Sequence, residues 1–328
     1  MTTTERAPGA KLDPAPFADA LTAVVDNVGA VIQGKRDVVE SVVLGLLAEG
    51  HLLVEDVPGV GKTSLAKALA RSLDVPFGRI QFTPDLLPAD VVGVNVWDRD
   101  ANEFDFRPGP VFASVLLADE VNRASPKTQS ALLEAMAERQ VTIDGTTRPL
   151  ARPFVVLATQ NPLEHEGTYP LPESQLDRFL LRLSVGYPDP ADEREMLDRH
   201  DGDDPVDSLQ PVLDASGLGR IIAATRAVHV AGALRDYLVA LADASRSHPD
   251  LALGVSPRAT LNLLQVIRAR ALLHRRAFAT PDDVHALARP ALAHRLTTGA
   301  DASLRGDDAD AIVDDLLASV PVPVPDRS

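Results

Sequence analysis

Residues 54–64 have the composition and spacing of a loop that binds phosphate groups. The segment reads Val-Glu-Asp-Val-Pro-Gly-Val-Gly-Lys-Thr-Ser and connects an apolar stretch at 51–56 to a helical pattern at 62–73. Backbone N–H groups at a helix N-terminus bind phosphate, and the helix dipole favours negative charge there. We expect Lys62 to reach the β- and γ-phosphates and the Thr63 hydroxyl to ligate Mg²⁺. The residues predicted to bind a nucleoside triphosphate are Pro58, Gly59, Val60, Gly61, Lys62, Thr63 and Ser64.

One position departs from the usual pattern of such a loop. The glycine expected five residues before Gly61 is replaced by Asp56. The loop therefore has to form its turn with Pro58, Gly59 and Gly61. This departure leaves the geometry of the loop open, while the roles expected of the lysine and the threonine stay the same.

A second apolar stretch, at 114–119, ends in two adjacent carboxylates, Asp119 and Glu120. In open α/β folds, ligands bind at the carboxyl ends of the strands, so these side chains are expected near the phosphates. We expect Asp119 to join the Mg²⁺ shell and Glu120 to act as general base on the attacking water. The alternative is an ordinary acidic strand end.

Three further polar residues could contribute to catalysis. Asn161 follows the apolar stretch 154–160, where an amide can orient the attacking water; before a proline, asparagine can also be a simple turn residue. Arg178 precedes the last apolar stretch of the first half, and Arg258 lies in the first turn of a predicted helix. A guanidinium near the γ-phosphate stabilises the transition state. From the residues alone, an intrasubunit ion pair for Arg178 and a solvated position for Arg258 stay open.

The bulk composition narrows the classes of function. The chain has 328 residues, a formal net charge of −15 and a sequence pI near 4.9. Its length predicts a large domain plus a smaller one. The negative charge argues against electrostatic binding of nucleic acid, which needs a basic face. The chain has no cysteine, which excludes disulfides and cysteine catalysis and fits a reducing compartment. We expect a cytoplasmic protein without membrane insertion, since no segment has the roughly 18 apolar residues of a span.

Residues 17–187 alternate short apolar stretches with helical patterns. This rhythm predicts an α/β domain with a parallel sheet covered by helices on both faces. The expected strands are 51–56, 79–82, 114–119, 154–161 and 181–185, and the clearest helices are 37–49, 62–73 and 127–139. Two hairpin insertions are predicted at 93–107 and 140–150, the second from its Asp-Gly turn.

The remaining segments are predicted to be a linker, a helical domain and two tails. Residues 188–217 are rich in Asp, Pro and Glu and are expected to be a linker. Residues 218–319 show helical periodicity throughout, which predicts a small all-helical domain. Residues 1–16 lack the apolar core of a signal peptide and are predicted to be a disordered tail, and 320–328 a second tail.

Four segments together resemble the MoxR family of AAA+ ATPases. They are the phosphate loop, Leu-Leu-Ala-Asp-Glu-Val-Asn-Arg-Ala at 116–124, Ala-Thr-Gln-Asn-Pro at 158–162, and Glu-Gly-Thr-Tyr-Pro-Leu-Pro-Glu-Ser-Gln-Leu-Asp-Arg-Phe at 166–179. The resemblance covers about 28–290. It implies an AAA+ core with a helical lid, and its two hairpins would be the helix-2 insert and the pre-sensor hairpin.

The resemblance also implies roles for single residues. Asn161 would be sensor 1 and Arg258 sensor 2, while Arg178 would be the arginine finger offered to a neighbouring subunit. Lys62 and Thr63 would form Walker A, and Asp119 and Glu120 Walker B. A weaker match at 31–34 suggests that Ile32 and Gly34 lie in the segment that contacts adenine.

As a function, the resemblance implies an ATP-hydrolysing, Mg²⁺-dependent ring of identical subunits, expected to be a hexamer. Such a ring would remodel or mature client proteins, often ones with von Willebrand factor A domains. One alternative is a magnesium-chelatase-like motor subunit, although 122–124 and 171–175 fit the MoxR pattern better. A DNA-directed AAA+ motor is disfavoured by the net charge and by the acidic residues of the first insertion.

Overall fold

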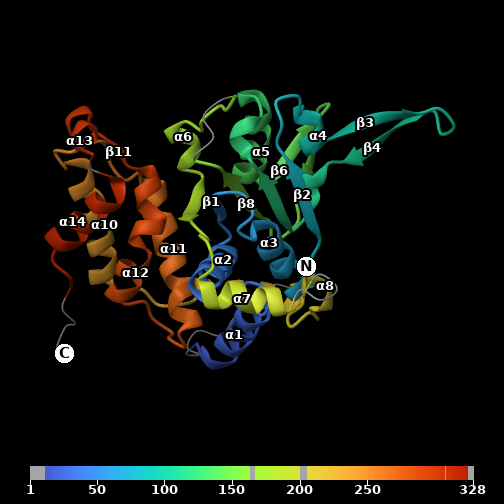
Figure 1. Cartoon of the computed structure of the whole chain (residues 1–328). Coiled ribbons are helices and arrows are strands. Elements are labelled where there is room, and N and C mark those ends of the chain that lie inside the picture. The colour runs from blue at the N-terminus through green and yellow to red at the C-terminus, as the bar shows by residue number, and fades with distance from the viewer. Residues whose placement is uncertain (1–11, 163–166, 200–204, 307, 324–328) are drawn as a thin grey trace.

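The computed structural model describes residues 12–162, 167–199, 205–306 and 308–323. Its centre is a five-stranded sheet in which every neighbouring pair of strands is parallel, in the order β2-β5-β8-β1-β9 (Figure 1). The strands are β1 (His51–Glu55), β2 (Phe77–Gln81), β5 (Val115–Asp119), β8 (Val155–Gln160) and β9 (Phe179–Leu183). The predicted parallel sheet is thus confirmed. The strands predicted at 79–82 and 181–185 begin two residues earlier, because Phe77 already pairs with Val115 and Phe179 with His51.

Helices cover both faces of this sheet. The core helices are α1 (Ala15–Gly29), α2 (Arg36–Leu47), α3 (Lys62–Ser72), α4 (Pro88–Val92), α5 (Pro126–Glu138) and α6 (Glu173–Leu176). Leu52 and Val54 pack with α1, α2 and α3, whereas Leu53 belongs to a second cluster with α5. Because both faces are buried, the inner strands β1, β5 and β8 are largely apolar runs without polar alternation, whereas the edge strand β2 carries the partly exposed Arg79 and Gln81.

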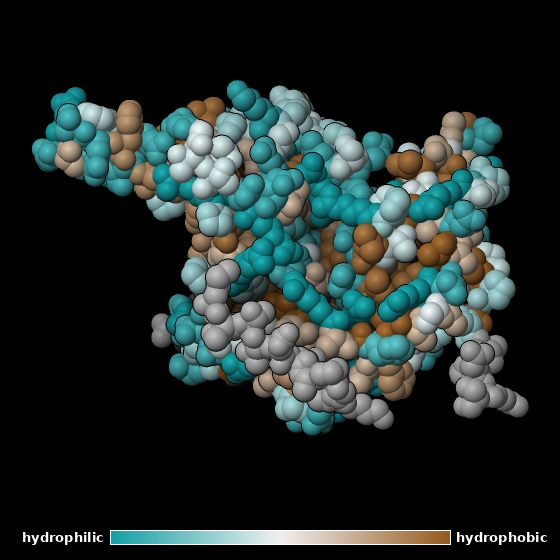
Figure 2. Space-filling model, turned by 180° about the vertical axis from the view of Figure 1, so that it is seen from behind, coloured by the Kyte–Doolittle hydropathy of each residue, from teal (hydrophilic) through white to brown (hydrophobic). Residues whose placement is uncertain are grey.

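Two hairpins interrupt the core, as predicted. β3 (Gly93–Asp98) pairs antiparallel with β4 (Glu103–Pro108), and β6 (Gln140–Ile143) with β7 (Thr146–Pro149). The β3–β4 hairpin projects away from the body of the molecule in both overall views, and Figure 2 shows a largely hydrophilic surface at its end. The Trp97 and Phe104 rings pack edge to face across it, with centroids 5.0 Å apart.

The segment predicted as a linker contains helices. α7 (Pro190–Arg199) and α8 (Pro205–Ser208) lie within 188–217, and α9 (Ala215–Arg226) begins there. Asp189 caps α7 by accepting hydrogen bonds from the backbone N–H groups of Ala191 and Asp192, and Asp214 caps α9. The Asp- and Pro-rich composition that suggested a linker therefore marks helix starts, where these residue types are favoured.

The C-terminal part is mostly helical, and the prediction of an all-helical domain was wrong in one detail. Its further helices are α10 (Gly232–Arg246), α11 (Pro257–Leu273), α12 (Pro281–Leu292), α13 (Ala300–Arg305) and α14 (Ala309–Ser319). The short strands β10 (Leu251–Leu253) and β11 (Thr297–Thr298) form an antiparallel pair. Strands of two or three residues are too short to leave a periodic signal in the sequence.

The N-terminal helix begins earlier than the sequence predicted. α1 begins at Ala15, inside the predicted N-terminal tail, while 1–11 and 324–328 lie outside the described residues. Among the residues that are described, no helix combines the length and apolar character needed to cross a membrane.

Candidate functional site

The predicted phosphate loop lies between β1 and α3, at the carboxyl edge of the sheet. Gly59 and Gly61 have φ values of 86° and 88°, a left-handed conformation that favours glycine. Gly61 is the N-cap of α3, so the free N–H groups of the first helical turn lie at this point. Lys62 Nζ donates to the carbonyl oxygens of Asp56 and Val57, at 2.9 and 3.2 Å. The Lys62 side chain is therefore hydrogen-bonded to the backbone of its own loop.

Five of the seven predicted loop residues (all but Val60 and Ser64) and two of the predicted catalytic residues, Glu120 and Asn161, line one pocket of about 230 Å³. Besides the loop, its lining comprises Arg79, Asp119, Glu120 and Asn161. The last three follow or end β5 and β8, which are neighbours in the sheet. The structure therefore brings Lys62, Thr63 and both predicted Walker B carboxylates together with the predicted sensor 1.

Thr159 organises the two acidic residues. Its hydroxyl donates to Asp119 Oδ1 at 2.6 Å and accepts from the backbone N–H of Glu120 at 2.9 Å. Arg79 Nη2 lies 3.0 Å from Asp119 Oδ2. Asp119 is thus fixed from β8 on one oxygen and from β2 on the other, which holds the carboxylate facing the pocket.

Glu120 is held in an unusual conformation. Its φ of 55° lies in the left-handed region, which is strained for a residue with a side chain and common at functional positions. Its Oε2 accepts a hydrogen bond from Gln81 Nε2 at 2.8 Å and lies 3.0 Å from Arg123 Nη1. The proposed general base is therefore restrained by two donors from outside the phosphate loop.

Asp56, the departure from the usual loop pattern, has a defined place. The residue is buried, with an exposed fraction of 7%. Oδ2 accepts hydrogen bonds from Ser184 Oγ and from the N–H groups of Val185 and Gly186, at 3.1, 2.5 and 2.7 Å. Oδ1 accepts from the N–H of Val57 at 3.0 Å. A glycine could make none of these bonds, so Asp56 fastens the phosphate loop to the chain that leaves β9.

The weaker sequence match at 31–34 lies beside the loop. Ile32 is buried, and its Cδ1 lies 3.7 Å from the position that a Cβ on Gly61 would take. Gly34 has a φ of 68°, and the carboxylate of Asp192, in α7, occupies the space of a would-be Cβ. The segment is therefore placed between the phosphate loop and α7, a position compatible with contact to a base.

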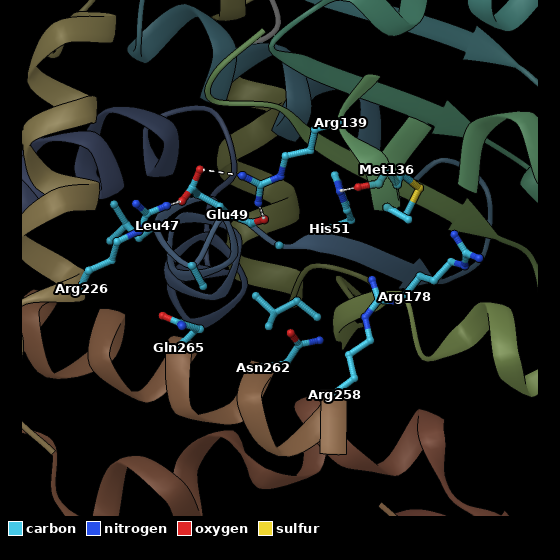
Figure 3. A pocket seen from close by; sticks show the side chains of 14 residues that line it. Leu47, Glu49, His51, Met136, Arg139, Arg178, Arg226, Arg258, Asn262 and Gln265 are labelled. Carbon is cyan, nitrogen blue, oxygen red and sulfur yellow. Dashed lines mark hydrogen bonds and ion pairs between the residues drawn. The ribbon is translucent and has the colours of Figure 1, made fainter. Parts of the chain in front are cut away.

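Arg178 and Arg258 lie elsewhere. They line a second pocket, of about 300 Å³, with His51 and Leu180 at the amino ends of β1 and β9 (Figure 3). A five-residue strand is about 16 Å long, so the sheet separates these arginines from Lys62 of the same chain. Arg178 Nη1 donates to the carbonyl oxygen of Leu133 at 2.8 Å, and among the described residues it has no carboxylate partner.

This second pocket is cationic. Its lining includes four arginines, at 139, 178, 226 and 258, and a single carboxylate, Glu49, which pairs with Arg139 at 2.9 Å and also with Arg226. Burial lowers the pKa of His51 to about 4, so this residue is neutral at pH 7. Arg258, Asn262 and Gln265 follow one another on one face of α11 and point into the pocket in Figure 3. Such a surface suits an anion.

Comparison with known proteins decides the family. The model of the "ATPase family associated with various cellular activities (AAA)" matches residues 51–181, and the AAA lid domain model matches 243–316. The chain is 42% identical to Chaperone MoxR1 of Mycobacterium tuberculosis (strain ATCC 25618 / H37Rv), over 97% of this chain and 86% of that protein. The chain belongs to the MoxR family of AAA+ ATPases.

Other comparisons agree with membership of the MoxR family. The chain is 47% identical to "Uncharacterized protein YeaC" of Bacillus subtilis (strain 168), over 92% of this chain and 94% of that protein. A crystal structure of a Cytophaga hutchinsonii protein superposes with a TM-score of 0.88 at 36% identity, covering 95% of this chain and 97% of the other. The similarity therefore spans both the core and the lid.

In this MoxR-family chain, the protein donors available to Mg²⁺ are few. Among the described residues, no group of three or more histidine or acidic side chains could hold a metal ion. The pocket instead offers one hydroxyl, Thr63, and two carboxylates, Asp119 and Glu120, of which Asp119 is the one expected to bind the metal. This set fits Mg²⁺, which in nucleotide sites takes one or two protein ligands and completes its shell with phosphate oxygens and water.

Sequence reasoning missed three members of the site. Arg79 and Gln81 come from β2, which was predicted as a strand but given no role, and Thr159 lies in a motif from which only Asn161 was selected. Their importance follows from strand order, because β2 and β8 flank β5. A single sequence does not specify which strands are neighbours, so the available signal was limited to the polar ends of these strands.

Proposed function

We propose that this chain hydrolyses ATP in a homo-oligomeric ring, a hexamer by family resemblance, in which each active site is shared by two subunits. The observation that carries this proposal is the separation of Arg178 and Arg258 from Lys62 by the length of the sheet. The two arginines cannot reach the phosphates bound by their own subunit. If the two arginines act on the phosphates of a neighbouring subunit, the cationic pocket that they line faces those phosphates. Hydrolysis would then require assembly of the ring.

Within one site, the residues would divide the work as follows. Lys62 and the N–H groups of the loop bind the phosphates, and Asn161 orients the attacking water. After leaving Gln81 and Arg123, Glu120 accepts the proton of that water as the water oxygen bonds to the γ-phosphorus; the bond from this phosphorus to the β,γ-bridging oxygen breaks, and ADP leaves. Mg²⁺, held by Thr63 and Asp119, would neutralise developing phosphate charge. The neighbour's Arg178 and Arg258 would stabilise the same charge from outside.

Assembly-dependent turnover can be tested by dilution. Hydrolysis per subunit should rise with protein concentration and level off once rings form, as monitored by native mass spectrometry. Lys62→Ala, which lacks the phosphate ligand, serves as the background control at each concentration. Constant activity per subunit at concentrations where only monomers are present would contradict the shared site.

We further propose that the ring remodels or matures client proteins, including proteins with von Willebrand factor A domains, in the cytoplasm. Support comes from the relative named Chaperone MoxR1 and from the net charge of −15, which disfavours a nucleic-acid substrate. Affinity capture with Glu120→Gln from a lysate should enrich specific proteins in ATP relative to ADP. Enrichment of nucleic acid in their place would contradict the chaperone role and favour a DNA-directed motor.

A further inference from the structure

The residue that precedes Arg178 is bonded to the lid. Ser256 Oγ donates to Asp177 Oδ1 at 3.0 Å, and Arg295 Nε lies 3.6 Å from the same oxygen. Ser256 is the N-cap of α11, the helix in which Arg258 is the second residue. A single carboxylate in the core is therefore joined to the first turn of the lid helix that carries the second arginine.

The residue that follows Arg178 is bonded to the same part of the lid. The carbonyl oxygen of Phe179 accepts hydrogen bonds from His294 Nε2, at 3.1 Å, and from Arg295 Nη2. The Arg295 side chain is 1% exposed and contacts both Asp177 and Phe179. One buried guanidinium thus contacts the residues on both sides of Arg178, Asp177 through its carboxylate and Phe179 through its backbone carbonyl.

Stability alone does not account for this guanidinium. Burial lowers the pKa of Arg295 to about 10, so it stays protonated at pH 7 beside Asp177. Its Nη1 is buried and has no hydrogen-bond partner among the described residues. Burying a charge with an unsatisfied nitrogen is unfavourable, and an apolar side chain of similar volume often serves a core better. What the arrangement does provide is a fixed geometry around Arg178.

We propose that Asp177 is a positioning residue that joins Arg178 and Arg258 into one unit, so that both guanidiniums meet the phosphates of a neighbouring subunit together. The inference rests on the proposed function, in which both arginines act across the subunit boundary. Asp177 and Ser256 are 79 positions apart in the sequence, so the chain itself does not set the distance between the two arginines. Figure 3 shows Arg258 extending from α11 toward Arg178 in the same pocket.

The position of Asp177 predicts a defect confined to the neighbour's site. Asp177 precedes β9 at the amino edge of the sheet, whereas Lys62 lies at the carboxyl edge. Asp177→Ala should therefore lower kcat of the assembled ring about 10²-fold, the loss expected from displacing a catalytic group by about 1 Å. Binding of a non-hydrolysable ATP analogue to the variant's own phosphate loop should be unchanged. A general structural defect would lower both quantities.

Matched variants distinguish the loss of the hydrogen bond between Asp177 and Ser256 from the loss of the Ser256 cap of α11. Asp177→Asn keeps an oxygen that can accept from Ser256 and should retain more turnover than Asp177→Ala. Ser256→Ala removes both the bond and the α11 cap, while Ser256→Thr keeps the hydroxyl and should restore turnover relative to Ser256→Ala. Asp214→Ala removes the cap of α9; Asp214 lines neither pocket and is at the opposite end of α9 from Arg226, so turnover should be unchanged. Equal loss in Asp214→Ala and Ser256→Ala would overturn the proposed role.

Mixed rings provide the decisive test. Asp177→Ala subunits have an intact phosphate loop, and Lys62→Ala subunits have an intact Asp177, so mixtures should regain activity. Arg178→Ala mixed with Lys62→Ala is run in parallel, and native mass spectrometry verifies mixed rings. If the Arg178→Ala mixture regains activity and the Asp177→Ala mixture does not, the positioning role is wrong and the shared site stands. If neither regains activity, the shared site itself is wrong, and this inference with it.

Discussion

Gln81 Nε2 lies 2.8 Å from Glu120 Oε2 and donates a hydrogen bond to it, so a residue of the neighbouring strand restrains the proposed general base. Arg123 approaches the same oxygen at 3.0 Å. These donors stabilise the carboxylate in the position that it occupies. We therefore predict that Glu120 has to leave them before it accepts a proton, so that its release is part of the barrier to hydrolysis.

Gln81→Ala should raise the turnover of assembled rings by about tenfold or more, since a hydrogen bond to a charged group contributes about 1.5–3 kcal/mol. The KM for ATP should change little, because Gln81 is absent from the lining of the phosphate pocket. Steady-state kinetics separates the two quantities. The double variant Gln81→Ala/Glu120→Gln should be inactive, which shows that the effect passes through Glu120. A fall in kcat of the single variant would contradict the restraint.

Asp56→Gly should lower both the stability of the protein and its affinity for ATP, although it restores the usual glycine of the loop. It removes four accepted hydrogen bonds and leaves the N–H groups of Val185 and Gly186 without this partner, at about 1–3 kcal/mol for each buried group left unpaired. We expect a lower thermal midpoint and about tenfold weaker ATP binding, with Asp56→Asn in between. Calorimetry and equilibrium binding measure both. Unchanged ATP affinity in Asp56→Gly would show that the bonds to 184–186 do not shape the loop.

Lys62→Ala and Glu120→Gln should separate binding from chemistry. The first removes the cation placed for the β- and γ-phosphates and should abolish ATP binding. The second is nearly isosteric and should bind ATP while losing turnover, because only the proton acceptor is gone. Calorimetry and phosphate release measure the pair. Retained hydrolysis in Glu120→Gln would remove the general-base assignment.

Stability should fall in mild acid because His51 is buried and neutral. Its Nε2 donates to the Met136 carbonyl oxygen, and its Nδ1 accepts from the N–H of Val156, a pairing that requires the neutral ring. The pKa is lowered from 6.5 to about 4, so the unfolded chain binds the proton more readily. The associated stability, of order 3 kcal/mol, is present above about pH 6.5 and is lost as the pH falls toward 4. In His51→Gln, the thermal midpoint should depend less on pH across this window; an identical dependence would exclude His51 as the cause.

The fold was predictable where local patterns coincide with tertiary structure. The strands ending at Asp119 and Gln160 are buried on both faces, so their apolar runs are conspicuous, and the loop at 54–64 carries its own spacing. The α7 helix and the β10–β11 pair were missed. The α7 helix begins in Asp- and Pro-rich sequence, which is typical of loops as well as of helix starts. The β10 and β11 strands are too short to give a periodic signal.

The site was predictable to the extent that its residues are consecutive in sequence. Lys62, Thr63, Asp119 and Glu120 could be selected because they end or follow recognisable elements, and the structure brings all four to one pocket. Gln81 and Thr159 hydrogen-bond to acidic residues at the end of the neighbouring strand β5. Asp56 accepts a hydrogen bond from the chain after β9. These contacts depend on the tertiary structure and cannot be read from the sequence. The catalytic roles themselves stay predictions.

The central claim, that one active site is built from two subunits, is tested most directly by mixing Arg178→Ala with Lys62→Ala. Each variant alone should be nearly inactive, since an arginine supplied in trans contributes about 10³–10⁵ in rate in GTPases. In an equimolar mixture, roughly a quarter of the head-to-tail interfaces would pair an intact loop with an intact arginine. We predict that hydrolysis returns to about that fraction of the unmodified ring. Mixed rings that form, as shown by native mass spectrometry, and stay inactive would contradict the account.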